Sequence, residues 1–420
     1  MSDAPQRRRS GRPGIARHGR LPRRRAWATA LIGIGTAAAV VVVSGLGVSA
    51  VALQSITGSV NTVKLSTDDQ STANKTDITA MKGGANILLA GSDTRIGQFD
   101  SNEDVEGARN DVTILVHISA DHTQLTAVSF PRDLVVPIPA CQNPSTGTTY
   151  PASSADMLNN SLGHGGLSCV VDTVENLTGL SIPYAGMITF DGVIEMSNAL
   201  GGVDVCVANT INDEYTGLHL TAGNHTLQGS DALAFLRTRH GVGDGSDLAR
   251  ISSQQVFLSA LLRQVTANGT LSNPLTLYKL ARAALSNMTL SDGLATTKTL
   301  VGLASTLRGM NTSDMLFVQY PVIDDPYNPA RVLVSQDAAH TLNLALQNDT
   351  KTSLSDSSTG RASKTEGGTS TGTGGGGGTA STPPSGGTSS SSATPTATAT
   401  PLPSSISGQS AAEQTCSVGN

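Results

Sequence analysis

Residues 109–133 read RNDVTILVHISADHTQLTAVSFPRD. Two β-rich runs, Val112–Ile118 and Leu125–Phe130, stand on either side of the polar pair Asp121 and His122. Such runs separated by a short polar turn are typical of a β-hairpin. In a hairpin, the first residues of one strand lie beside the last residues of the other, so the flanking charges are expected at one edge of a sheet. These charged residues are Arg109, Asp111, Arg132 and Asp133.

A third strand is expected to extend this edge. The run Asn86–Ala90 is followed by a long loop over 91–110. If the run is antiparallel to Val112–Ile118, its C-terminal end brings Asp93 and Arg95 to the same edge. Arginine offers a planar fork for phosphate, and paired aspartates suit Mg²⁺ that also contacts phosphate oxygens. The alternative is a solvated rim of ion pairs, each contributing about 0–1 kcal/mol.

A second charged segment follows over 236–250. It carries Arg237 and Arg239, and an amphipathic run then begins with Asp247 and Arg250. The last two residues are spaced i, i+3, so both can face one side of a helix. The alternative is that Asp247 or Ser246 is simply a helix N-cap with Arg250 paired nearby, and both interpretations can hold together.

The whole segment 83–350 alternates short β-rich runs with longer helical patterns. This alternation predicts a single α/β domain, with an α+β-like arrangement of a central mixed sheet flanked by helices. Further strands are expected over Ile182–Phe190, Val203–Val207 and Leu316–Val322. Helices are expected over Leu167–Leu177, Gly192–Leu200, Asp231–Leu236, Leu248–Val265, Pro274–Leu285, Leu294–Leu307 and Asp337–Leu346.

The N-terminal part predicts a membrane anchor. Residues 1–25 hold nine arginines and one acid, Asp3, and residues 26–53 carry no charge. As a helix, the second stretch would span about 42 Å, against about 30 Å for a hydrocarbon core. Arginines directly before an apolar span hold the N-terminus in the cytoplasm. We therefore expect a cytoplasmic arm, one transmembrane helix preceding the domain, and an extracytoplasmic remainder at the cell membrane.

Two alternatives concern this N-terminal part. The apolar stretch could be a cleaved secretory signal, because Ala, Gly and Ser stand near its end, although it is longer than the apolar region of such signals. The arginines could form a nucleic-acid arm, because dense cationic charge binds phosphate. The positive-inside pattern is the better explanation, and no nucleic-acid partner is expected.

Two polar segments flank the domain. Residues 54–82 lack periodicity and are expected to form a stalk. Residues 351–420 are mostly Ser, Thr, Gly, Pro and Ala and predict a disordered tail.

The four cysteines, Cys141, Cys169, Cys206 and Cys416, have no CxxC spacing. Disulfides are permitted outside the cytoplasm, and Cys141 with Cys169 is the preferred pair, because both lie beside predicted loops. Spacing leaves the connectivity open, and Cys416 is either a tether or a bystander.

Several motifs together resemble the LytR-CpsA-Psr family, in an actinobacterial-like form. They are NILLAGSDTR at 86–95, RND at 109–111, SFPRD at 129–133, RTR at 237–239, DLAR at 247–250 and the glutamine pair at 254–255. The resemblance covers about 84–265. It implies an Mg²⁺-dependent phosphotransferase that moves a glycopolymer from a polyprenyl-pyrophosphate carrier to peptidoglycan, in a phosphoglycosyl transfer that forms a phosphodiester link.

The resemblance also assigns roles residue by residue. It makes Asp93 and Asp111 the carboxylates associated with Mg²⁺, with Mn²⁺ as a substitute. The catalytic residues implied are Asp93, Arg132 and Asp247, of which either aspartate would take the proton of a sugar hydroxyl. It makes Arg109, Arg132, Arg237, Arg239 and Arg250 the pyrophosphate ligands, and Arg95 and Gln254 are also expected to bind substrate.

Two positions depart from the family pattern. Asn110 replaces a usual serine, and Ser253 replaces a usual arginine, which removes one phosphate ligand. Apolar side chains of the helices expected over Gly192–Leu200 and Leu248–Val265 either line a tunnel for the polyprenyl chain or belong to the ordinary core. They include Val193, Ile194, Met196 and Leu200 in the first helix and Ile251, Val256, Phe257 and Leu261 in the second.

Two other functions fit the same residues. One is a non-catalytic envelope regulator that binds pyrophosphate lipids. The other is a pyrophosphatase that hydrolyses the lipid donor. The carboxylates expected to hold Mg²⁺ favour catalysis over regulation, whereas the sequence does not separate transfer from hydrolysis.

Overall fold

The computed structural model describes residues 61–65, 84–92, 109–143, 147–267, 274–355, 359–366 and 399–420. The arm predicted over 1–25 and the transmembrane helix predicted over 26–53 lie outside these residues, as does most of the stalk predicted over 54–82. Within the described ranges, no helix combines the length and the apolar character that a membrane span requires. One short part of the predicted stalk, residues 61–65, belongs to the fold, because it forms a strand and buries Leu65.

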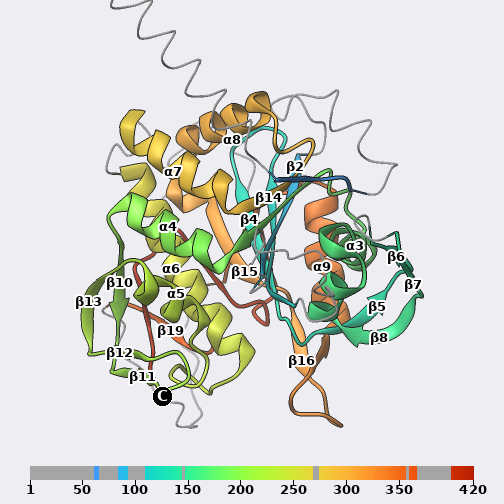
Figure 1. Ribbon diagram of the computed structural model, residues 1–420. Coiled ribbons are helices and arrows are strands. Elements are labelled where there is room, and N and C mark those ends of the chain that lie inside the picture. The colour runs from blue at the N-terminus through green and yellow to red at the C-terminus, as the bar shows by residue number, and fades with distance from the viewer. Residues whose placement is uncertain are drawn as a thin grey trace, which may run out of the picture. The chain divides into compact units, whose positions relative to one another are not determined.

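A mixed sheet of eight strands lies at the centre of the domain (Figure 1). Its strands in spatial order are β1 (Asn61–Val63), β14 (Met288–Ser291), β9 (Tyr184–Thr189), β2 (Ala85–Ser92), β3 (Asn110–Ile118), β4 (Leu125–Phe130), β15 (Met315–Gln319) and β21 (Gly408–Ser410). Strands β2, β3 and β4 are antiparallel neighbours, and β9 and β15 are parallel to β2 and β4. The predicted mixed α/β fold, the hairpin and the antiparallel third strand are therefore confirmed.

Helices cover both faces of this sheet (Figure 1). Leu88 and Leu115 face a cluster that includes side chains of α3 (Ser161–Thr178) and α9 (Gln336–Gln347). Their neighbours Ile87 and Ile114 face a second cluster, with side chains of α6 (Asp247–Ala267), α7 (Pro274–Ser286) and α8 (Thr297–Gly309). Successive strand residues point to opposite faces, so a strand buried on both faces is apolar throughout.

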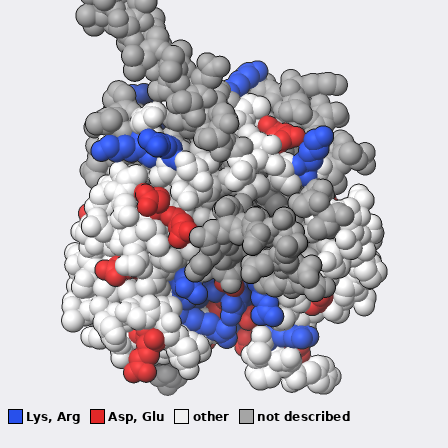
Figure 2. Space-filling view, viewed as in Figure 1, with Lys and Arg blue, Asp and Glu red and all other residues white. Residues whose placement is uncertain are grey.

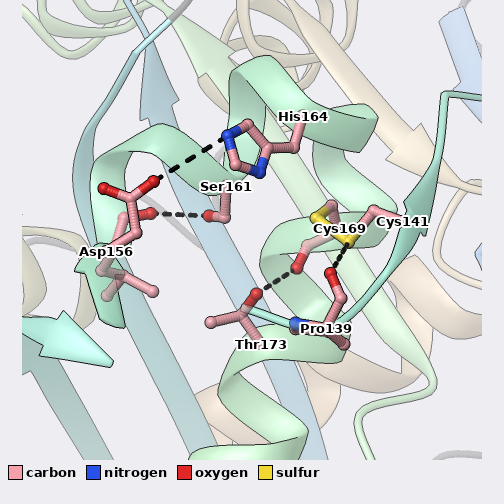
Figure 3. The surroundings of a disulfide bond; sticks show 8 residues. Pro139, Cys141, Asp156, Ser161, His164, Cys169 and Thr173 are labelled. Carbon is pink, nitrogen blue, oxygen red and sulfur yellow. Dashed lines mark hydrogen bonds and ion pairs between the residues drawn. A yellow bond between two sulfur atoms is a disulfide. The ribbon is translucent and has the colours of Figure 1, made fainter. Parts of the chain in front are cut away.

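A disulfide between Cys141 and Cys169 confirms the preferred pairing and fastens β6 (Cys141–Gln142) to α3 (Figure 3). The helix begins six residues before its predicted start, and its backbone is kinked at Gly165 and Gly166. A Cβ atom at Gly165 would lie 2.7 Å from Cys141 Cβ and 2.8 Å from Cys169 Cβ. Glycine is therefore required where the helix passes the disulfide.

Short strands surround this disulfide and the sheet edge. They are β5 (Val135–Ile138), β7 (Thr149–Tyr150) and β8 (Ser153–Met157), followed by the 3-10 turn η3 (Leu158–Asn160). A separate hairpin of β16 (Val322–Asp324) and β17 (Val332–Val334) follows β15, which is itself preceded by the turn η5 (Thr312–Asp314).

A smaller lobe stands beside the main sheet. Its sheet has the order β13 (Gly223–Leu227), β10 (Val203–Val207), β22 (Thr415–Ser417) and β19 (Ser363–Thr365). The hairpin of β11 (Ile211–Asp213) and β12 (Leu218–Leu220) and the helix α5 (Ser230–Arg237) complete the lobe. Its core joins the main domain through α6, since Phe257 packs with Phe235 and Val205.

The prediction of a disordered tail over 351–420 is wrong for the residues that the structure describes there. β20 (Thr400–Pro401) pairs with β18 (Thr352–Ser353), β21 pairs with β15, and β22 pairs with both β10 and β19. A second disulfide, Cys206–Cys416, fixes the last strand. Backbone pairing and a few buried apolar residues such as Ile406 hold a segment whose average composition is polar. Residues 367–398 lie outside the described residues.

Candidate active site

Asp111 and Arg132 meet at the predicted sheet edge. Asp111 is the second residue of β3, and Arg132 follows the end of β4 by two positions. The Nη1 atom of Arg132 donates to Oδ1 of Asp111 at 2.8 Å. Antiparallel pairing of β3 with β4 sets this contact, because it places the start of one strand beside the end of the other.

Asp247 connects this edge to α6. Its Oδ2 atom accepts a hydrogen bond from the backbone amide of Arg132 at 3.0 Å, and its Oδ1 atom lies 2.6 Å from Nη2 of Arg250. Arg250 also donates from Nη2 to the backbone carbonyl of Asp111 at 2.8 Å. The side chains of Asp247 and Arg250 are 2% and 7% exposed, so the pair is buried. The predicted i, i+3 relationship is confirmed, and it holds Arg132 as well.

Arg237 and Arg239 come from the end of α5 and the loop after it. The guanidinium of Arg237 lies over the ring of Phe190, 4.5 Å from its centroid, in a cation–π contact. Arg239 donates from Nε to the carbonyl of Gly245 at 3.1 Å. Gln254 on α6 donates to the carbonyl of Leu236 at 2.8 Å and so fastens the last turn of α5 to α6.

Asp213 organises the loop that carries Arg239, although none of the sequence motifs above includes this residue. Its Oδ2 atom accepts hydrogen bonds from the Thr238 hydroxyl at 2.6 Å and from the amides of Arg239 at 3.1 Å and Gly241 at 3.3 Å. Burial acts to raise the pKa of Asp213, but these hydrogen bonds outweigh it and lower that pKa below its ordinary value.

These side chains surround one cavity of about 510 Å³. Its polar end is lined by Asp111, Arg132, Arg237, Arg239, Arg250 and Gln254. Its wall is apolar and includes Ile188, Val193, Met196, Leu200, Leu236, Phe257, Leu258 and Leu261. Figure 2 shows basic side chains gathered in a hollow on the face seen in Figure 1, between the lobe of β10–β13 and the β16–β17 hairpin. The cavity thus combines a cationic end with a hydrocarbon-like wall.

The two helices expected to line a tunnel, now α4 (Phe190–Leu200) and α6, contribute unequally. Five of the eight expected apolar residues line the cavity, namely Val193, Met196, Leu200, Phe257 and Leu261. Ile251 and Val256 instead belong to the buried core, at 2% and 0% exposure. Helical periodicity predicts which residues share a face, but the packing partners decide which face meets the cavity.

The structure does not place every predicted site residue at the cavity. Arg109 is exposed and is not among the residues that line it. Asp93 and Arg95 lie outside the described residues. Position 253 does not face the cavity either, because Ser253 is fully buried and its hydroxyl lies 2.7 Å from that of Ser417. Ser253 itself is therefore not part of the described cavity, and the loss of a phosphate ligand through the absent arginine stays a prediction.

Asp133 has an unusual ionisation. Burial, followed by the negative charge of Asp247, raises the pKa of Asp133 to about 6, against the opposing charges of Arg239 and Arg132. Within the described part of the chain, its Oδ1 atom is buried with no hydrogen-bond partner.

The ionisation of Arg132 is shifted toward its charged form. Burial acts to lower the pKa of Arg132, but Asp111 and Asp247 raise it overall. The arginine is thus held firmly in its charged form.

The sequence pattern of the LytR_cpsA_psr family matches residues 50–349. The chain belongs to the LytR_cpsA_psr family. That match includes every residue of the cavity's polar end, and it extends beyond the stretch over which the motifs resembled the family.

Several characterised LytR_cpsA_psr proteins are similar to this chain. The cell wall biosynthesis protein LcpA of Corynebacterium glutamicum is 29% identical over 271 residues, which cover 59% of this chain and 51% of LcpA. The polyisoprenyl-teichoic acid–peptidoglycan teichoic acid transferase TagT of Bacillus subtilis is 31% identical over 206 residues, which cover 48% of this chain and 58% of TagT. The chain thus spans about half the length of these relatives.

A solved structure shares the fold. The LytR-Csp2A-Psr enzyme from Actinomyces oris superimposes with a TM-score of 0.52 at 24% identity, over 68% of this chain and 95% of that one. This likeness supports the arrangement of sheet and helices in the LytR_cpsA_psr domain described above.

Proposed function

We propose that this chain is a phosphotransferase that moves a glycopolymer from a polyprenyl-pyrophosphate carrier onto peptidoglycan during cell-wall assembly. The observation that carries the proposal is the cavity, whose lining combines several arginines with a large apolar wall. A ligand that suits both parts has an anionic head and a hydrocarbon tail, and a polyprenyl pyrophosphate has both. The names of TagT and of LcpA, a teichoic acid transferase and a cell wall biosynthesis protein, support the same conclusion.

In the proposed reaction, a hydroxyl oxygen of peptidoglycan attacks the phosphorus that carries the glycopolymer. The new oxygen–phosphorus bond replaces the bond to the polyprenyl phosphate, which leaves as a monophosphate, and the hydroxyl proton passes to a carboxylate. Negative charge grows on the leaving phosphate, so fixed cations near it lower the barrier. Arg132 and Arg250 suit this task because Asp111 and Asp247 already hold their guanidinium groups in place.

The carboxylates divide into two roles in this proposal. One oxygen of Asp247 accepts a hydrogen bond from the amide of Arg132, and the other forms an ion pair with Arg250. We assign Asp247 to positioning the two arginines instead of accepting the proton. The proton acceptor is then Asp93, whose role rests on its place in the sequence motif.

Mg²⁺, or Mn²⁺ in its place, fits this cluster through Asp111. Among the described residues, no group of three or more His, Cys, Asp and Glu side chains is placed to hold a metal alone. Mg²⁺ does not need such a group, because one or two carboxylates, water and substrate phosphates usually complete its coordination. Asp111, together with Asp93, would hold the ion, which would neutralise part of the phosphate charge.

The proposed location is the outer side of the cell membrane, with the N-terminus in the cytoplasm. The arginine-rich segment directly before an uncharged stretch supports it, since this order follows the positive-inside rule. A single membrane helix would keep the domain beside the lipid-linked donor, and peptidoglycan would lie within reach on the same side.

The test is transfer of a labelled glycan by the full chain in lipid nanodiscs. The reaction contains a polyprenyl-pyrophosphate glycan, an uncross-linked peptidoglycan acceptor and Mg²⁺, and label on the acceptor and released lipid phosphate are both measured. Arg132→Ala is expected to reduce transfer by about 100- to 1,000-fold, the typical cost of losing one group that stabilises transition-state charge. Arg308→Ala on α8 is the matched control, because Arg308 is exposed and does not line the cavity.

Each alternative has its own outcome in this assay. Release of lipid phosphate without label on the acceptor would assign the chain to the pyrophosphatases. Lipid binding with no turnover, unchanged by Arg132→Ala, would support the regulator. Equal transfer by wild type and Arg132→Ala would show that the cavity is not the active site.

A further inference from the structure

An exposed aromatic pair stands at the rim of the cavity. Tyr215, in the turn between β11 and β12, is 84% exposed, yet it lines the cavity together with His240 and Arg239. The ring centroids of Tyr215 and His240 are 4.5 Å apart and the rings are tilted by 40°. Large apolar side chains that remain exposed beside a binding cavity are frequent contact sites for ligands.

The pair is fixed relative to the arginines. Oδ1 of Asp213 accepts a hydrogen bond from the amide of Tyr215 at 3.0 Å, and Oδ2 accepts one from the amide of Arg239 at 3.1 Å. On the other side, the backbone carbonyl of His240 accepts a hydrogen bond from the side chain of Asn420. The carboxylate of Asp213 and the side chain of Asn420 therefore fix the backbone that carries the two rings beside Arg239.

We propose that Tyr215 and His240 form a subsite for a sugar ring, namely the first sugar joined to the pyrophosphate of the donor. The inference rests on the proposed function and extends it from the pyrophosphate to the glycan. A sugar attached to a phosphate at Arg239 would lie within reach of the adjacent rings. An aromatic face covers the apolar side of a sugar, while the phenol and imidazole supply polar atoms for its hydroxyl groups.

Tyr327 offers a matched control for this surface. It is 95% exposed, it lies in the turn between β16 and β17, and it does not line the cavity. Substitutions of Tyr215 and Tyr327 therefore remove the same exposed group from two places that differ in their relation to the cationic end. Because both side chains are exposed, neither substitution is expected to affect folding.

The test measures binding of three ligands to the full chain in nanodiscs. They are a short polyprenyl pyrophosphate that bears one N-acetylhexosamine, the same lipid without sugar, and a soluble uncross-linked peptidoglycan chain. Tyr215→Ala should weaken binding of the sugar-bearing lipid by about tenfold and leave the sugar-free lipid unchanged, whereas Tyr215→Phe should retain most of the affinity. Tyr327→Ala should leave the affinity for both lipids unchanged.

Three results would overturn the subsite. Equal loss for both lipids would mean that Tyr215 acts on the pyrophosphate region and not on a sugar. Loss only for the peptidoglycan chain would assign the rings to the acceptor. Unchanged binding of all three ligands would remove Tyr215 from recognition altogether. Failure of the proposed transfer looks different, because it would appear in the labelled-glycan assay as no label on the acceptor. If neither lipid binds to wild type or to any variant, the cavity is not the lipid site and the subsite falls with it.

Discussion

Asp247 accepts a hydrogen bond from the backbone amide of Arg132 at 3.0 Å, although the two residues are 115 positions apart. This bond joins the end of β4 to the first turn of α6. The same carboxylate lies 2.6 Å from Nη2 of Arg250, so one buried side chain sets the positions of two arginines from different elements. The geometry of the cationic end therefore depends on Asp247 more than on any exposed ion pair.

Replacement of Asp247 by Ala should destabilise the fold. It leaves Arg250 buried without its counter-charge, a change that typically costs about 3–5 kcal/mol. The free energy of unfolding in urea measures this effect. Asp337→Ala, in the first turn of α9, is the control, because Asp337 is exposed and should cost less than about 1 kcal/mol. Similar losses for the two variants would contradict the role assigned to Asp247.

Phe190→Leu should reduce transfer without a matching loss of stability. The ring of Phe190 lies 4.5 Å from the guanidinium of Arg237, and a cation–π contact contributes about 0.5–2 kcal/mol. We expect kcat/KM to fall by about 3- to 20-fold, since Arg237 loses its support. Phe190→Tyr keeps the aromatic face and should retain activity. If Tyr and Leu at this position reduce kcat/KM equally, the ring does not position Arg237.

Removal of the Cys206–Cys416 disulfide should cost more stability than removal of Cys141–Cys169. The first bond joins residues 210 positions apart and the second joins residues 28 apart. Loop-closure entropy gives about 5 kcal/mol for the longer loop and about 3.5 kcal/mol for the shorter one. Urea denaturation of the two double Cys→Ser variants measures the difference. If the variant without Cys141–Cys169 loses more free energy of unfolding, local contacts outweigh chain entropy.

The ionisation of Asp133 should make stability depend on pH. Its pKa rises from an ordinary value of 3.8 to about 6 in the folded chain. The folded state thus binds the proton more tightly than the unfolded state, so the stabilising contribution is complete below pH 3.8 and is lost as pH rises through about 6.

The variant Asp133→Asn lacks this titration. Its unfolding midpoint should therefore rise relative to that of wild type between pH 3.8 and about 6 and then stay level. Subtracting the two midpoints at each pH removes the contributions of the other carboxylates. If the difference between the two unfolding midpoints stays constant over this range, burial does not raise the pKa of Asp133.

Local patterns predicted most of the elements. The runs at Val112–Ile118 and Leu125–Phe130 became β3 and β4, because an apolar strand buried on both faces leaves a clear signature in sequence. The edge formed by Asp111 and Arg132 followed from strand direction alone, since a hairpin has only one way to align its ends. The spacing of Asp247 and Arg250 likewise required only helical geometry.

The sequence did not predict the contacts between segments that are far apart along the chain. Composition predicted disorder for Thr415–Ser417, yet β22 pairs with β10 and β19, and ladder hydrogen bonds do not depend on side-chain polarity. No motif in the sequence included Asp213, whose hydrogen bonds to Thr238 and Arg239 depend on contacts between segments 25 and 26 positions apart. The side chain of Ser253 faces Ser417 of that strand, a contact that no local pattern predicted.

The sequence by itself determined the elements, the strand-end charges and the family, because each is encoded in residues that are neighbours along the chain or repeat with a fixed period. The tertiary structure alone decided that Arg132, Arg239 and Arg250 share one cavity, that Phe257 lines it while Ile251 does not, and that Asn420 contacts the loop beside it. Those facts arise from packing between elements far apart in sequence, and no local pattern records which faces will meet.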